Sequence, residues 1–141
     1  MKMRRITESK WTSDLLAMLR EGLGPMYSVL KHSDRFTENI PDFSVSNDGR
    51  TIWVEVKVLR KPDHSLANPH HYVDQPAQLH LCSKLRGWYL VHDPWVGVTL
   101  LTPAVALEAQ YQGIRDSGAA RYIPNSKLVE EMIKFFYGGQ A

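Results

Sequence analysis

Alternating apolar and polar residues in the middle of the chain predict a β-hairpin. The stretches DFSVS (42–46) and TIWVEVKVL (51–59) are rich in β-branched and aromatic residues, which favour strands. The residues NDGR (47–50) separate the two stretches, and Asp-Gly is a strong signal for a tight hairpin turn.

The second strand of this hairpin has two different faces, because side chains alternate along a strand. One face is apolar and is expected to point into a core: Ile52, Val54, Val56 and Val58. The other face carries Trp53, Glu55 and Lys57. Taken alone, an acid and a lysine two residues apart are typical of the solvated face of an amphipathic strand.

The N-terminal part of the chain has helical periodicity over residues 7–21, where Thr7 can cap the first turn. Apolar side chains recur there at three- and four-residue intervals: Trp11, Leu15, Met18 and Leu19. The residues EGLGP (21–25) end this helix. The stretch MYSVL (26–30) is compatible with a short strand, and a polar loop follows it.

The chain after the hairpin predicts further helices and strands. Residues 61–75 contain two prolines and three histidines and indicate a long loop. We expect a helix at 76–86 that Pro76 opens and Gly87 ends, strands at 88–93 and 96–102, and helices at 103–112 and 126–137. The order predicts an α/β fold with a small mixed sheet flanked by helices. The last helix is amphipathic, so it either packs on the domain or forms a dimer face.

Composition places this chain among ordinary globular proteins. Its 141 residues suit one domain, and 43% of them are hydrophobic and 23% charged. The formal net charge of +2 is only weak evidence for a polyanionic partner. Cys82 is the only cysteine. No apolar run is long enough to span a bilayer, so we expect no membrane association. The N-terminus leads into no secretory core, and we expect a cytoplasmic protein, in the host cytoplasm if the source is a phage or other mobile element.

The hairpin also brings together residues that suit metal-assisted chemistry. Asp42 begins the first strand and pairs roughly with residues 55–57, so Asp42, Glu55 and Lys57 can share one face. Two close carboxylates repel each other, and a divalent cation relieves that repulsion. Hard oxygen ligands favour Mg²⁺ or Mn²⁺, which can activate water and polarise a phosphodiester. A nearby lysine can orient or deprotonate the water, or stabilise developing negative charge.

Pro41-Asp42 followed by Glu55-Val56-Lys57 resembles the signature of the PD-(D/E)XK nuclease superfamily. The resemblance implies a restriction-endonuclease-like αβββαβ core over about residues 8–102, with C-terminal helices over 103–141, in a single domain of residues 1–141. It also implies a Mg²⁺- or Mn²⁺-dependent DNA endonuclease. The small size favours structure-directed or weakly sequence-specific cutting.

The stretch QPAQLHLCSKLRGWYLV (75–91) is similar to the corresponding part of VRR-NUC domains and Holliday-junction resolvases. By this resemblance Gln78 is the glutamine that supports the site, with Gln75 as the alternative. The family acid of the first helix corresponds to Glu8, with Glu21 and Asp14 as alternatives. The implied metal ligands are Asp42, Glu55, the main-chain carbonyl of Val56 and Glu8. Lys57 would position or activate water.

Contacts with DNA are expected from the segment after the acid-x-lysine strand: Arg60, Lys61, His70 and His71. The histidines of the chain match no zinc-binding spacing. Cutting a duplex or a junction would need two sites and therefore a homodimer.

Two other functions remain compatible with the sequence. The first is a catalytically silent nucleic-acid-binding module on the same fold, and the second is a protein-interaction domain in which the motif is fortuitous. Two carboxylates near a phosphate argue against a pure binder, because they would only repel its ligand.

Overall fold

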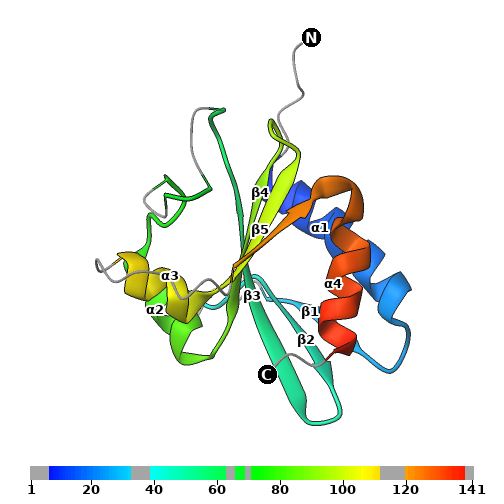
Figure 1. The fold of residues 1–141 in the computed structure, drawn as a ribbon. Coiled ribbons are helices and arrows are strands. Elements are labelled where there is room, and N and C mark those ends of the chain that lie inside the picture. Colours follow the sequence, from blue (N-terminus) through cyan, green and yellow to red (C-terminus); the bar gives the residue numbers. More distant parts are fainter. Residues whose placement is uncertain (1–6, 33–38, 63–65, 69–70, 112–119, 139–141) are drawn as a thin grey trace.

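The protein consists of one six-stranded sheet with helices on both sides (Figure 1). The computed structural model describes residues 7–32, 39–62, 66–68, 71–111 and 120–138. The elements in chain order are α1 (Glu8–Leu23), β1 (Ser28–Lys31), β2 (Phe43–Asn47), β3 (Arg50–Val58), α2 (Pro76–Lys84), β4 (Trp88–Asp93), β5 (Val98–Pro103), α3 (Ala104–Tyr111), β6 (Arg121–Pro124), the 3₁₀ turn η2 (Asn125–Lys127) and α4 (Leu128–Tyr137).

The strands lie in the order in which they occur in the chain, from β1 to β6. Only the central pair β3 and β4 is parallel, and the other four pairs are antiparallel. The parallel pair requires a long crossover, and the segment with α2 supplies it. The order α1, β1, β2, β3, α2, β4 confirms the expected αβββαβ core with a mixed sheet.

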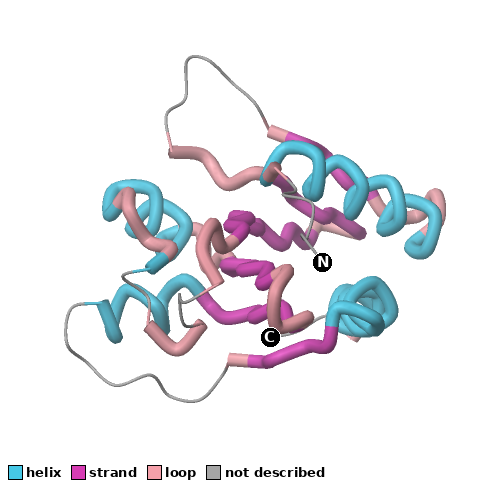
Figure 2. Tube along the Cα trace, turned by 90° about the horizontal axis from the view of Figure 1, so that it is seen from above, coloured by secondary structure: helices cyan, strands magenta, loops and turns pink. Residues whose placement is uncertain are grey.

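The helices α1 and α4 form one layer, and the helices α2 and α3 form the other (Figure 2). Thr7 caps α1, since its Oγ1 accepts a hydrogen bond of 3.1 Å from the Lys10 amide. The buried face of α1 comprises Leu15, Leu16, Leu19 and Leu23. Met18, which was expected on that face, is 47% exposed because the apolar stripe passes through Leu16 instead.

The C-terminal helix α4 packs against α1 and the sheet, which is the first of the two roles expected for it. Met132, Phe135 and Phe136 are buried in the same core as Phe43 and Val54 of the sheet. Burial of these large side chains is the main source of stability for a helix of this length.

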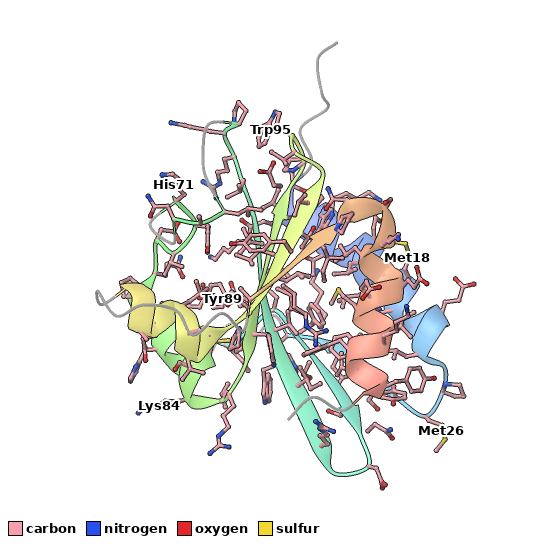
Figure 3. All side chains as sticks on the ribbon, in the orientation of Figure 1. Met18, Met26, His71, Lys84, Tyr89 and Trp95 are labelled. Carbon is pink, nitrogen blue, oxygen red and sulfur yellow. The ribbon has the colours of Figure 1, made fainter. Side chains whose placement is uncertain are left out.

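The second core lies between β4 and β5 and the layer of α2 and α3. Figure 3 shows Tyr89 between the sheet and these helices, and this side chain is 1% exposed. Tyr72 and Val73 belong to this core, so the described end of the 61–75 segment is packed rather than a free loop. No described residue of β1, β2 or β3 belongs to this second core.

The hairpin has the predicted strands and turn. Asn47 pairs with Arg50, and the two turn residues between them, Asp48 and Gly49, have φ values of 51° and 81°. Positive φ at both central residues is what a type I′ turn requires.

Two features of the C-terminal half differ from the expectation. Strand β6 was missed, because four residues that end in proline carry too little alternation, so residues 103–141 are not all helical. Helix α2 ends at Lys84, and Arg86 rather than Gly87 has a positive φ of 56°. Gly87 is needed for space: an added Cβ would lie 2.6 Å from Cys82 Sγ and 3.1 Å from the Trp53 carbonyl oxygen.

Among the described residues, no helix combines the length and the apolar character needed to cross a bilayer.

We predict that Gly87→Ala lowers the free energy of unfolding by about 1–3 kcal/mol, because main-chain atoms on two sides of the added methyl must move. Denaturant unfolding measures this loss. Arg86→Gly is the matched control, since it relieves a positive φ and adds no atom, and it should not lower stability. Equal stability of Gly87→Ala and the wild type would contradict the prediction.

Candidate active site

The site lies at the end of the β2–β3 hairpin that is away from its turn. Regular pairing begins with Phe43 opposite Val54, so Asp42 stands just outside the ladder. Its Oδ2 accepts a hydrogen bond of 2.7 Å from the Val56 amide, and its main-chain carbonyl accepts one of 2.8 Å from the His32 amide. The Asp42 carboxylate is therefore held by the backbone of the neighbouring strands.

Glu55 is buried beside Asp42. Its side chain faces the same side of the sheet as Trp53 and Lys57, as the alternation predicts, but the residue is only 2% exposed. One of its oxygens, Oε1, is buried and has no hydrogen-bond partner. Tyr89 is its neighbour on β4 and closes this side with a buried ring.

The pKa of Glu55 is raised from its ordinary value of 4.5 to about 9. Burial is the main cause of this rise, and the negative charge of Asp42 is the second. Burial also raises the pKa of Asp42, although the Val56 amide and a hydrogen bond with Glu55 oppose this. A proton shared by the two carboxyl groups therefore stabilises the metal-free site at neutral pH.

Lys57 lies between two carboxylates. Its Nζ is 3.6 Å from Glu55 Oε2 and 3.7 Å from Asp74 Oδ1, and its side chain is 13% exposed. Asp74 was missed by the sequence reasoning. It lies in the segment before α2, and its closeness to β3 follows only from the crossover.

Glu8 is the acid of α1 that reaches this site. Its pKa is raised overall, mainly by burial and also by the negative charge of Asp42. The charge of Lys57 and a hydrogen bond from the Val58 amide oppose this rise. The alternatives lie elsewhere: Asp14 pairs with Lys10 in an exposed contact of 2.9 Å, and Glu21 is exposed.

Three clefts meet at Glu8. One of about 310 Å³ is lined by Glu8, Lys57, Val58, Arg60, His71, Tyr72, Asp74 and Gln75. A second of about 380 Å³ is lined by Glu8, Ser9, Thr12, Lys31, His32 and Asp42. A third of about 450 Å³ extends toward Trp95, which Figure 3 shows at the same end of the molecule as His71. Asp42 and Lys57 thus line two different clefts that share Glu8, whereas the buried Glu55 lines none of these three clefts.

The remaining predicted site residues are only partly brought together. Arg60 lines the same cleft as Lys57, and Lys61 next to it is exposed. Gln78 is half-buried with an unpartnered Oε1, whereas the alternative Gln75 lines the cleft that contains Lys57. His70 lies outside the described residues.

The arrangement of donors fits a hard divalent cation. Among the residues that the structure describes, no three histidine, cysteine, aspartate or glutamate side chains are grouped closely enough to hold a metal ion by themselves. Mg²⁺ does not need such a group, since it is usually held by one or two carboxylates and keeps several waters. A cation at this point would give Glu55 Oε1 a partner and would relieve the mutual repulsion of Asp42 and Glu55.

The Cys82 thiol and the Tyr89 phenol are not suited to be reactive groups of this site. Burial raises the pKa of Cys82 to about 12, so its thiol stays protonated at neutral pH. Burial, and after it the charge of Glu55, also raises the pKa of Tyr89.

Comparisons with known proteins give structural likenesses but no sequence relative. No family model matches the chain, and no curated protein matches it. Among solved structures, Hjc, a Holliday junction resolvase from the archaeal hyperthermophile Archaeoglobus fulgidus, matches 88% of this chain and 92% of its own length, with 15% sequence identity and a TM-score of 0.45. A likeness at this level supports no conclusion about activity.

We predict that Glu55→Gln stabilises the metal-free protein at pH 8 by about 1–3 kcal/mol. The folded-state pKa of Glu55 lies above its unfolded value of 4.5, so the folded protein holds a proton that the unfolded chain releases. Stability therefore falls as the pH rises from about 4.5 to about 9. The glutamine amide replaces the protonated carboxyl and never ionises. Thermal unfolding in EDTA between pH 5 and pH 9 measures the difference.

The same experiment tests the metal site without any substrate. Mg²⁺ or Mn²⁺ should raise the melting temperature of the wild type, more strongly at high pH because the shared proton must leave. The cation should not raise the melting temperature of Glu55→Gln. The exposed Glu21→Gln is the matched control and should behave like the wild type in both respects. A destabilised Glu55→Gln protein at pH 8 would contradict the expectation.

Proposed function

We propose that this protein is a nuclease that hydrolyses DNA phosphodiester bonds with the help of Mg²⁺ or Mn²⁺. The observation that carries the proposal is the buried pair of Asp42 and Glu55 with Lys57 beside it, where Lys57 and Asp42 each line a cleft that Glu8 shares. Structural acids are rarely buried next to one another, because the repulsion destabilises the fold. Such a cost is typical of sites where a ligand restores the balance. The PD-(D/E)XK-like sequence pattern supports the same function.

Asp42, Glu55 and the Val56 carbonyl would hold the cation, with Glu8 close enough to bind one of its waters. When bound, the cation supplies a Lewis acid that polarises the phosphodiester and lowers the pKa of a coordinated water. The Val56 amide fixes the Asp42 carboxylate, so little reorganisation is needed when the cation binds. Tyr89 keeps bulk water away from Glu55.

The role proposed for Lys57 is to stabilise negative charge on the phosphate and to orient the attacking water. Its Nζ is held by Glu55 and Asp74 at 3.6 and 3.7 Å, so it is positioned before substrate arrives. Asp74 is 70% exposed, and it is therefore proposed as a positioning residue that acts through Lys57.

DNA is the proposed partner, because these two clefts are lined by Arg60 and Lys31, with Lys61 exposed nearby. These side chains would bind phosphates and carry no sequence information themselves. Weakly specific or structure-directed cutting follows from this. Cutting both strands would require a second copy of the chain.

We predict that the purified protein cuts labelled DNA only with Mg²⁺ or Mn²⁺, and that Lys57→Ala lowers the rate by about 100-fold or more, the usual range for loss of one preorganised charge. A panel of single-stranded, duplex, flap and four-way-junction substrates measures the activity and names the substrate. Asp42→Asn should also be inactive, and Asp14→Asn is the matched control that should cut normally. Cleavage in EDTA, or an active Asp42→Asn protein, would refute the mechanism. Binding without any cleavage would favour a silent nucleic-acid-binding module.

A separate prediction concerns phosphate contacts. Arg60→Ala and Lys61→Ala should each weaken DNA binding similarly for different sequences and should each reduce the slope of log Kd against log salt by about 1. Fluorescence anisotropy at several salt concentrations gives this slope. Lys84→Ala, at the end of α2, is the control and should leave the slope unchanged. An unchanged slope for Arg60→Ala and Lys61→Ala would place the DNA elsewhere.

A further inference from the structure

The face of β1–β3 that carries Glu55 has an aromatic pair beside the acids. On this face the residues of the three strands form cross-strand rows, and one row is Leu30, Ser44 and Trp53. The second core does not extend under this row in the described part of the chain. Leu30 at the edge of the sheet is 53% exposed and Trp53 is partly exposed, whereas Ser44 between them is buried under the His32 contact.

Trp53 differs from the other tryptophans of the chain. Trp11 and Trp88 pack against the first core, and Trp95 packs against the second. Trp53 is half-buried and belongs to neither core, although it lies in the centre of the hairpin. An aromatic ring in this position adds little to either core.

The ring of His32 lies against Trp53. The two ring centroids are 5.0 Å apart with an angle of 35° between the planes. His32 Nε2 is 2.8 Å from Ser44 Oγ, which fixes the imidazole on the sheet. His32 also lines the cleft that contains Asp42 and Lys31. His32 therefore connects Trp53 with the candidate active site.

We propose that Trp53 and His32 form a stacking site for an unpaired nucleobase of the strand whose phosphate lies at Asp42 and Glu55. A nucleotide combines a flat aromatic base with a phosphate, and His32 places the Trp53 ring next to the cleft that Asp42 and Lys31 line. Glu55 and Trp53 are two residues apart on one strand, about 7 Å, so a base and a neighbouring phosphate can contact both. Bases inside a continuous duplex are covered on both faces and cannot stack on Trp53. The site therefore selects single strands, flaps, gaps and branch points.

This subsite relies on the proposed function for its place beside the scissile phosphate, but its occupancy does not require hydrolysis. The test compares the binding of an oligothymidine of about 12 nucleotides with that of an equally long strand of abasic sites, by fluorescence anisotropy in Ca²⁺ with intact probe verified afterwards. The wild type should bind the oligothymidine about 10-fold more tightly, the range expected for one stacked base. Trp53→Ala should lose this preference, and Trp53→Phe should keep most of it. The affinity of Trp53→Ala for a blunt duplex should equal that of the wild type.

The outcomes separate this inference from the proposed nuclease activity. Equal binding of the two strands by the wild type, or no binding of oligothymidine, would overturn the stacking site even if DNA is cut. This comparison needs no variant, so it holds even if Trp53→Ala fails to fold. A base preference that Trp53→Ala abolishes would support the site even if no substrate is hydrolysed. A preference that persists in a folded Trp53→Ala protein would place the stacked base elsewhere and overturn the assignment.

Discussion

The hydrogen bond from the Val56 amide to the Asp42 carboxylate is the contact on which the site depends. It takes the place of the next rung of the β2–β3 ladder, at the point where the two strands stop pairing. Because an unpaired amide inside a sheet is costly, the strand itself holds the carboxylate in position. Glu55 then lies next to a second acid whose position is already determined, and the shared proton of this pair follows from the same geometry.

The position of the site follows from the two layers of helices. The first core packs against Phe43, Val45, Val54 and Val56 of the hairpin strands, whereas the second core rests on β4 and β5. Beside β3 the second core ends, so it covers only part of the other face of this strand. Glu55 is buried there next to Tyr89, Lys57 lines a cleft beside Asp74, and Trp53 belongs to neither core. Chemistry and recognition can therefore occupy neighbouring positions of a single strand.

Local patterns predicted most of the elements and the central pair of acids. The alternation in 51–59, the Asp-Gly turn, the capping Thr7 and the Pro76 helix start each act within a few residues, and each is present as expected. Predictions failed where the sequence pattern was short or where the constraint was a steric contact with a distant residue. The four residues of β6 carry too little pattern to be recognised, and Gly87 looked like a helix end although its real constraint is the closeness of Cys82 and the Trp53 carbonyl.

The sequence by itself determined the hairpin, and with it the meeting of Asp42, Glu55 and Lys57, because strand alternation and turn geometry are local. Only the tertiary structure decided which acid of the first helix reaches this pair. The resemblance favoured Glu8 and left Asp14 and Glu21 as alternatives, and only Glu8 lies where α1 starts beside the end of β3. The contribution of Asp74 and the place of Trp53 outside both cores were also decided there, because both depend on how far the crossover segment and its helix cover the sheet.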